Sequence, residues 1–180
     1  AVHLLGKDIN WFHNVIWPAL LLSAGYPLYN ETFVHSFLKI CGQKISKSLG
    51  NVITPKELID RYGKDGARYV ILSNFPYKND SDVTWELLDD KYTADLVNGF
   101  GNTVARLAKL AERSGIEFPT KDVQQKPWSE DWAAPIEEYR IEDVLKNIWK
   151  QISELDKHIN ENEPWAIKDN NKLKEVLGYE

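Results

Sequence analysis

The sequence predicts an α/β region followed by an all-α region, and three observations lead to this prediction. Residues 2–5 form a short apolar run typical of a buried parallel strand, and residues 32–40 alternate loosely in a way that favours a second strand. Residues 10–24, between them, read as a strongly apolar helix. The second half of the chain has helical periodicity at residues 85–113 and 136–160. With 180 residues, the chain can bury one core or two small ones.

Local signals mark the start of a helix at residue 55. Thr54 fits an N-cap, Pro55 fits the first helical position, and Glu57 completes a capping box three residues after the cap. Gly63 and Gly66 should interrupt this helix, and we expect a second short helix to follow.

Prolines and turn-forming residues divide the rest of the chain. Pro18 should bend the first helix after Trp17. Residues 74–84 are rich in turn formers, which predicts a connector with a domain boundary near it. Residues 121–135 should form an irregular link, and Pro164 should stop the last long helix.

Residues 42–51, Gly-Gln-Lys-Ile-Ser-Lys-Ser-Leu-Gly-Asn, carry the clearest functional signal. Two ammonium groups and two hydroxyls alternate within five residues: Lys44, Ser46, Lys47 and Ser48. Together they can bind one polyanion, such as a chain of phosphates. Gly42 and Gly50 relax the backbone at the two ends, so the segment can hinge as a flap. A solvated basic turn is the alternative interpretation.

The stretch Lys44-Ile45-Ser46-Lys47-Ser48 resembles the Lys-Met-Ser-Lys-Ser signature of class I aminoacyl-tRNA synthetases. Gly6-Lys7-Asp8, followed by Phe12-His13 and Trp17-Pro18, resembles the methionyl-tRNA synthetases in particular. The resemblance runs from about residue 2 to about residue 167. Ile45 stands where the family usually carries Met, a change of similar volume that should cost little.

The resemblance implies the second half of a Rossmann-type nucleotide-binding domain followed by an anticodon-binding helix bundle. Residues 1–54 would be the catalytic part with the flap, residues 55–84 the stem-contact helices and connector, and residues 85–180 the anticodon-binding domain, truncated at its C-terminus. The family's His-Ile-Gly-His signature does not occur in the sequence. We therefore expect an N-terminal half of the synthetase to be missing, and the chain alone to be inactive.

The family pattern also assigns the nucleotide-binding residues. Lys47, helped by Lys44, would be catalytic, because these ammonium groups can neutralise charge on the departing pyrophosphate. The implied ATP-binding residues are Lys44, Ser46, Lys47, Ser48, Gly6 and Asp8. Gly6 and Asp8 follow the first strand, where open α/β sheets place ligands. From its position alone, Asp8 could equally be a helix N-cap.

The amino-acid pocket is expected on the first helix. Phe12 and Ile16 are one turn apart, as are His13 and Trp17. Aromatic rings with one polar group suit a flexible thioether, although such a stripe more often fills a core. The resemblance favours the pocket, because Phe12, His13 and Trp17 match the residues that line it in the family.

The helix at residues 85–113 predicts a second functional surface. Its buried stripe should recur every four residues: Leu88, Tyr92, Leu96, Phe100 and Val104. Asn102 and Arg106 lie on the opposite face, where a solvated surface is the ordinary expectation. The resemblance implies that these two residues and Trp165 read the anticodon, through hydrogen bonds and stacking. Without the resemblance, a Trp after Pro164 would more often anchor a helix end.

The net charge and the cysteine count of the sequence limit how the chain can bind nucleic acid and whether it can bind zinc. Residues 1–55 contain four lysines and two acidic residues, Asp8 and Glu31, which gives them a net charge of +2. Because the whole chain has a net charge of −5, residues 56–180 carry −7. This charge argues against binding nucleic acid through a broad basic face. The single Cys41 excludes a cysteine-rich zinc site within the chain and favours a reducing compartment, so we expect the cytoplasm.

The resemblance implies a methionine–tRNA ligase whose partners are ATP with Mg²⁺, methionine and a methionine-accepting tRNA. No apolar run is long enough for a membrane span. Two alternatives are an RNA-binding module alone and another class I synthetase of the cysteine or leucine type. The latter shares the flap but not the Phe12-His13 and Trp17-Pro18 run.

Overall fold

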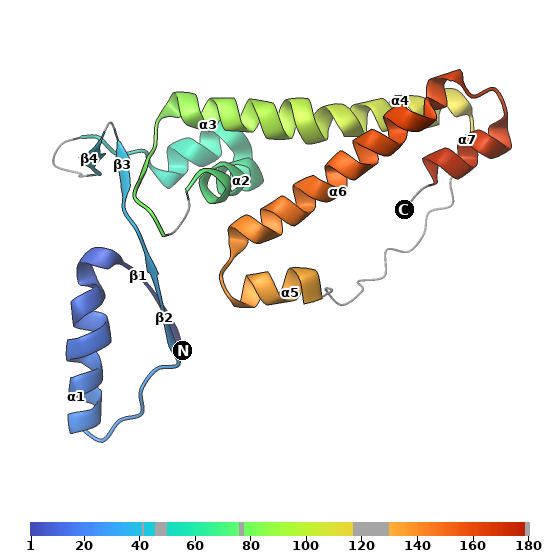
Figure 1. Ribbon diagram of the computed structural model, residues 1–180. Helices are drawn as coiled ribbons and strands as arrows, with labels where there is room; N and C mark the ends of the chain where they lie inside the picture. The colour runs from blue at the N-terminus through green and yellow to red at the C-terminus, as the bar shows by residue number, and fades with distance from the viewer. Residues whose placement is uncertain (41, 46–49, 76–77, 117–129, 179–180) are drawn as a thin grey trace. The chain divides into compact units, whose positions relative to one another are not determined.

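The computed structural model describes most of the chain and divides into two compact units, Ala1–Asp90 and Lys91–Glu180 (Figure 1). The first unit contains strands and helices, and the second is helical. The described residues are 1–40, 42–45, 50–75, 78–116 and 130–178.

The first two strands form a parallel pair. β1 (Val2–Gly6) runs beside β2 (Glu31–His35), and Gly6 lies opposite His35 at their carboxyl ends. This confirms the strand expected at residues 2–5. The single strand expected over residues 32–40 is wrong, because the chain leaves the first sheet after His35.

A second small sheet begins at Leu38, three residues after the end of β2. β3 (Leu38–Ile40) pairs antiparallel with β4 (Gln43–Lys44) and parallel with β5 (Ser81–Asp82). The expectation that residues 74–84 form only a connector is therefore wrong. Their last part supplies an edge strand that pairs with β3, and β4, on the other side of β3, belongs to residues 42–51, here called the Lys/Ser loop.

The helix between β1 and β2 is not uniform. After the 3₁₀ turn η1 (Lys7–Ile9) comes the π-helical segment η2 (Phe12–Ile16), and then α1 (Trp17–Ser23). The backbone N–H of Trp17 bonds to the carbonyl of Phe12, five residues back. Pro18 has no N–H and stands in the first turn of α1. The irregularity expected at Pro18 thus takes the form of a π turn before it.

The helix α2 (Pro55–Asn74) begins as its sequence predicts. The Thr54 side chain accepts from the N–H of Glu57, and the Glu57 carboxylate accepts from the N–H of Thr54 at 2.7 Å. Bonds to Thr54 lower the pKa of the Glu57 carboxyl. Gly63 breaks the helix with φ of 71°, whereas Gly66 is helical. The interruption is therefore confirmed at Gly63 only.

The buried side chains of the first unit come mainly from α2, with others from β1, α3 (Trp85–Lys91) and Val83. Arg61 and Tyr62 both donate to Asp89 of α3, at 2.8 and 2.7 Å. Burial raises the pKa of the Tyr62 hydroxyl to about 12. The buried apolar side chains of this unit are Leu5, Leu58, Tyr62, Ala67, Val70, Val83 and Leu88.

The second unit is built from helices that follow one another along the chain. Its elements are η4 (Tyr92–Gly101), α4 (Asn102–Ser114), α5 (Glu130–Glu137), α6 (Ile141–Asn162), η5 (Pro164–Ala166) and α7 (Asn170–Leu177). The helix expected over residues 136–160 is divided at Tyr139, which has φ of 58°. Residues 130–135, expected to be irregular, belong to α5.

The predicted buried stripe along residues 88–104 is partly wrong. Leu88 is fully buried, but Phe100 and Val104 are exposed. Within the second unit the inward positions are Gly99 and Thr103. A Cβ on Gly99 would lie 3.1 Å from the Trp149 ring of α6, and the Thr103 hydroxyl donates to Asp156 at 3.0 Å. The prediction treated residues 88–104 as one helix packed against one partner. Leu88 and Thr103 instead belong to the cores of different units.

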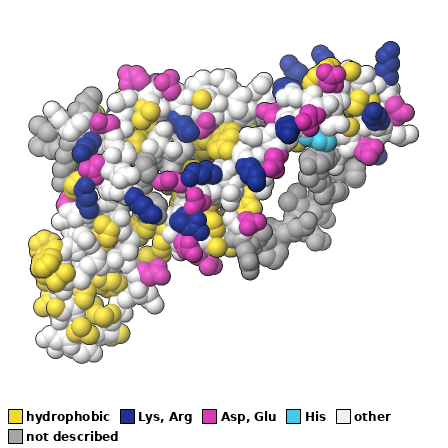
Figure 2. Space-filling model, viewed as in Figure 1, with side chains coloured by type: hydrophobic (Ala, Val, Ile, Leu, Met, Phe, Trp, Pro, Cys, Tyr) yellow, Lys and Arg dark blue, Asp and Glu magenta, His cyan; other side chains and the backbone are white. Residues whose placement is uncertain are grey.

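Exposed apolar side chains gather around η2 and α1, at the lower left of Figure 2. They include Trp11, Phe12, Trp17, Leu20 and Leu22. In the part of the chain that the structure describes, no helix is long and apolar enough to cross a bilayer.

Candidate functional site

The Lys/Ser loop stands on a described base. Ser46, Lys47 and Ser48 lie outside the described residues, and of Lys44 only the backbone, in β4, is described. Gly42 and Gly50 have φ of 73° and 69°. Because side chains disfavour this left-handed conformation, both positions favour glycine.

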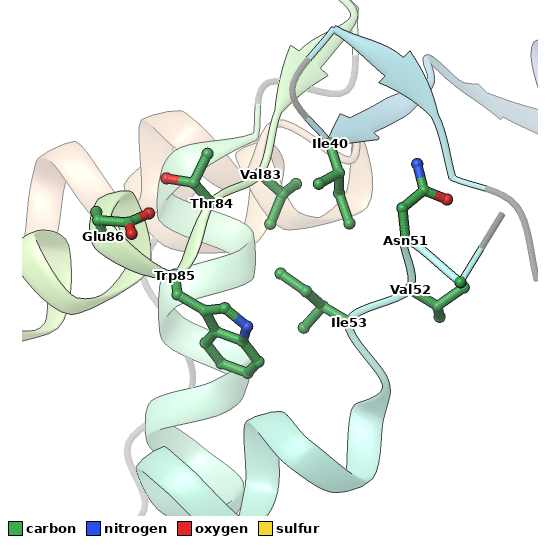
Figure 3. Close-up of a pocket in the computed structure, with 9 residues that line it drawn as sticks. Ile40, Asn51, Val52, Ile53, Val83, Thr84, Trp85 and Glu86 are labelled. Carbon is green, nitrogen blue, oxygen red and sulfur yellow. The ribbon is translucent and has the colours of Figure 1, made fainter.

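Two features fix the base of this loop. The N–H of Gly42 donates to the Asp82 carboxylate at 2.7 Å. After the loop, residues 50–53 line a pocket of about 290 Å³ together with β3 and the start of α3. Figure 3 shows Ile40, Ile53 and Val83 pointing toward one another there. The described residues on both sides of the loop are therefore fixed, Gly42 by the Asp82 carboxylate and residues 50–53 beside apolar side chains of β3 and Val83.

Gly6 and Asp8 lie close together at the carboxyl end of β1. A Cβ at Gly6 would come within 2.9 Å of Asp8 Oδ1, so any larger residue would displace this carboxylate. Asp8 belongs to η1, whose N-cap position is Gly6, so the N-cap interpretation of Asp8 finds no support. Both residues occupy the edge of a parallel pair where α/β proteins bind ligands.

Asp80 joins this edge to the base of the loop. Its carboxylate accepts from Lys7, from Lys39 of β3 at 3.0 Å, and from the N–H of Phe37 at 3.1 Å. The Lys7 ammonium also lies 4.6 Å from the centre of the Phe37 ring. Bonds to Lys7 and then Lys39 hold the pKa of the Asp80 carboxyl well below its usual range. The structure thus brings the Gly-Lys-Asp turn and the base of the Lys/Ser loop together.

Replacing Asp80 with asparagine should destabilise the chain at neutral pH but not in acid. Because the folded pKa of Asp80 is lowered, its ionised form adds stability above the unfolded value of 3.8, and this contribution disappears as the pH falls below it. Thermal unfolding between neutral and acid pH should therefore show the melting curves of Asp80→Asn and the unaltered chain converging in acid. Asp60→Asn, in an exposed pair with Lys56, is the control. Equal melting temperatures of Asp80→Asn and the unaltered chain at neutral pH would contradict this account.

An apolar cavity of about 450 Å³ lies beside β1 and the helix that follows. It is lined by His3, Phe12, His13, Ile16, Trp17 and Leu20. Phe12 and Trp17 are 58% and 45% exposed, so they do not fill the core of this chain. The structure therefore brings the three residues predicted for the amino-acid pocket to one cavity.

His13 and His3 are the polar residues that line this cavity, and two contacts orient the His13 ring. Its Nδ1 lies 3.1 Å from the carbonyl of Ile9, which can only accept, so Nδ1 donates and Nε2 is left for a ligand. The His3 ring meets the His13 ring edge-on at 6.2 Å. A largely apolar cavity lined by an oriented imidazole suits a side chain such as a thioether beside a polar backbone group.

In the second unit the structure brings two predicted anticodon residues together. The Arg106 guanidinium lies 5.9 Å from the centre of the Trp165 ring. Arg106 also donates to Asn160 at 2.9 Å and forms an ion pair with Asp156 at 3.7 Å. Asn102, one turn before Arg106, is exposed. An aromatic ring beside a guanidinium and an amide can bind unstacked bases.

Trp165 does not anchor the helix end. Pro164 is buried in η5, whereas Trp165 is 53% exposed. The proline therefore supplies the apolar anchor after α6, and the indole ring remains available on the surface.

Sequence reasoning missed three residues of these sites. Asp80 and Asp82 were assigned to a turn-rich connector, whereas Asp80 pairs with Lys7 and Lys39, and Asp82 accepts from the N–H of Gly42. Tyr29, whose hydroxyl donates to the carbonyl of His13, had no signal in the sequence.

The features of the first unit define a class of protein. A parallel strand pair carries a Gly-Lys-Asp turn at its carboxyl end, and the same unit contains the two left-handed glycines that flank the Lys/Ser sequence, Gly42 and Gly50. The family model described as tRNA synthetases class I (M) matches residues 1–108.

Relatives and solved structures agree with this match. The chain is 35% identical to the methionine–tRNA ligase of Thermotoga maritima over 92% of its own length and 28% of the relative. It is 38% identical to that of Caldanaerobacter subterraneus subsp. tengcongensis over 95% of its own length and 29% of the relative. The methionyl-tRNA synthetase of Mycobacterium tuberculosis in complex with methionyl-adenylate is similar in structure, with a TM-score of 0.77, 28% identity, and coverage of 98% of this chain and 37% of that one.

The chain therefore has the fold of a class I aminoacyl-tRNA synthetase. It belongs to the methionyl-tRNA synthetase family. It spans less than a third of the length of the curated relatives that it matches.

Proposed function

We propose that this chain forms the C-terminal half of the Rossmann-type catalytic domain and most of the anticodon-binding bundle of a methionine–tRNA ligase. The observation that carries the proposal is the shared cavity of Phe12, His13 and Trp17. It lies in the same unit as Gly6, Asp8 and the base of the Lys/Ser loop. We also propose the cytoplasm as its compartment, because its single cysteine is typical of reducing conditions.

The reaction has two steps. The carboxylate oxygen of methionine attacks the α-phosphate of ATP, forming an acyl–phosphate bond as the bond to pyrophosphate breaks. A terminal ribose hydroxyl of the tRNA then attacks the acyl carbon, and AMP leaves. Mg²⁺ accompanies ATP as part of the substrate. The protein contributes by positioning the reactants and stabilising charge rather than through covalent chemistry.

Each group of residues has a role in this proposal. The cavity of Phe12, His13 and Trp17 holds the methionine side chain, with His13 Nε2 as its polar contact. Gly6 lets the adenosine approach the backbone, and Asp8 accepts from its ribose hydroxyls. Lys47 is the principal cation at the departing pyrophosphate, assisted by Lys44 and the hydroxyls of Ser46 and Ser48. The ion pairs of Asp80 with Lys7 and Lys39 hold the Gly-Lys-Asp turn beside β3, at the base of the Lys/Ser loop.

The second unit contacts the anticodon in this proposal. Trp165 stacks on one base, while Arg106 and Asn102 donate to base edges. The overall negative charge of this region favours recognition by a few shaped contacts over a broad electrostatic one.

Methionine-dependent exchange of pyrophosphate into ATP tests whether the site is shared with the rest of the synthetase. We expect exchange by the complete ligase and none by the 180-residue chain alone, because the chain lacks the His-Ile-Gly-His segment. Exchange by the purified chain would contradict the proposed division of the site. Binding of tRNA by a complete protein that shows no exchange would favour an RNA-binding module instead.

A further inference from the structure

Tyr29 donates a hydrogen bond to a carbonyl of the π turn that has no backbone donor in the π register. In the π register, the N–H of Trp17 bonds to the carbonyl of Phe12, five residues back. The next donor in that register would be residue 18, which would bond to the carbonyl of His13. Residue 18 is a proline and has no N–H, so this carbonyl loses its helical partner.

The Tyr29 hydroxyl fills this gap by donating to the His13 carbonyl. The same hydroxyl lies 3.1 Å from Asn14 Oδ1, which accepts from the Thr32 hydroxyl of β2 at 2.9 Å. The Tyr29 ring stacks on His3 of β1 with the ring centres 4.3 Å apart. Tyr29 thus joins the π turn to β1, and Asn14 of the turn bonds to β2.

The π turn matters because it shapes the cavity. When backbone bonds close over five residues, positions four and five apart share one side of the helix, so Phe12 can line a cavity with both Ile16 and Trp17. An ordinary α-helical turn would rotate these side chains relative to one another. The His13 ring, whose carbonyl is the one held, lines the same cavity.

We propose that Tyr29 is a positioning residue for the amino-acid pocket: its hydroxyl replaces the backbone N–H that Pro18 lacks and so holds the π turn that presents Phe12, His13 and Trp17. The role in substrate binding rests on the proposed function, whereas the role in holding the turn does not.

The test uses Tyr29→Phe in the complete ligase, a change that removes the hydroxyl and keeps the stack on His3. An unsatisfied carbonyl should shift the π turn, and we expect the KM for methionine to rise about tenfold while the KM for ATP stays constant. Tyr26→Phe is the matched control, because it deletes a hydroxyl from the same loop on a side chain that is 65% exposed. An unchanged KM for methionine in Tyr29→Phe would overturn the proposal.

Pro18→Ala separates this role from a general structural one. The substitution restores the N–H that can bond to the His13 carbonyl, so adding Tyr29→Phe to it should change the KM for methionine less than about twofold. A merely structural tyrosine would cost the same in both backgrounds, and that result would overturn the proposal.

Hydrogen exchange provides a readout that is independent of substrate. We expect amide exchange at residues 14–17 to speed up about tenfold in Tyr29→Phe, and to show no further increase when Tyr29→Phe is added to Pro18→Ala. If the ligase activated an amino acid other than methionine, the proposed function would fail, yet this pattern of exchange would still support the role of Tyr29. Unchanged exchange in Tyr29→Phe would overturn that role even in an enzyme that uses methionine.

Discussion

Replacing Lys47 with alanine should lower the rate of pyrophosphate exchange by the complete ligase on the order of 10²–10³-fold. The physical reason is that negative charge builds on the departing pyrophosphate, and an ammonium aimed at it stabilises the transition state more than the ground state. The KM for methionine should therefore change little, because the amino-acid cavity lies on other residues. Steady-state exchange kinetics with varied methionine and ATP separate these effects.

Lys64→Ala is the matched control for this substitution. Lys64 is an exposed lysine of α2, and its removal changes the net charge of the chain equally. We expect exchange close to that of the unaltered enzyme. If Lys47→Ala and Lys64→Ala had the same small effect, the loop would be a solvated basic turn.

Replacing Trp165 with alanine should weaken binding of the anticodon stem-loop of a methionine-accepting tRNA. Stacking of one base on an aromatic ring contributes about 1–3 kcal/mol, so the Kd should rise roughly 5- to 150-fold. The exposed indole beside Arg106 supports this expectation, because a ring that anchored the helix would be buried. Titrations at one fixed salt concentration measure the effect.

Phe100→Ala is the control for Trp165→Ala. Phe100 belongs to the same unit and is 50% exposed, against 53% for Trp165, so both substitutions remove a similarly accessible aromatic ring. We expect Phe100→Ala to leave the Kd unchanged. An equal Kd for both variants would remove Trp165 from the RNA-binding surface.

Local signals in the sequence predicted the elements that depend on neighbouring residues. The capping box of Thr54 and Glu57, the break at Gly63 and the first strand all appear in the structure. Gly42 and Gly50, where the sequence indicated a relaxed backbone, both adopt the left-handed conformation.

Features that depend on tertiary partners could not be predicted in this way. β5 forms because residues 81–82 meet β3, about forty residues earlier in the chain, and no local pattern contains that pairing. The inward face of η4 and α4 is set by the Trp149 ring, which requires Gly99 rather than a bulky apolar residue. The spacing of Leu88 and Phe100 alone could not show which partner each would meet.

The candidate sites show the same division. The residues of the pocket could be assigned from the resemblance, and the structure places Phe12, His13 and Trp17 at one cavity. Tyr29 bonds to a backbone carbonyl beside this cavity, and Asp80 pairs with lysines distant in sequence at the Gly-Lys-Asp turn and β3. Such contacts carry no motif, so only the structure could identify them.

We propose that this cavity and the Lys/Ser loop together activate methionine with ATP in the complete ligase. Pyrophosphate exchange by the complete ligase, measured with methionine, leucine and cysteine in turn, tests it most directly. We predict exchange with methionine and only background rates with leucine or cysteine. Exchange that depends on leucine or cysteine, or none with methionine, would contradict the claim.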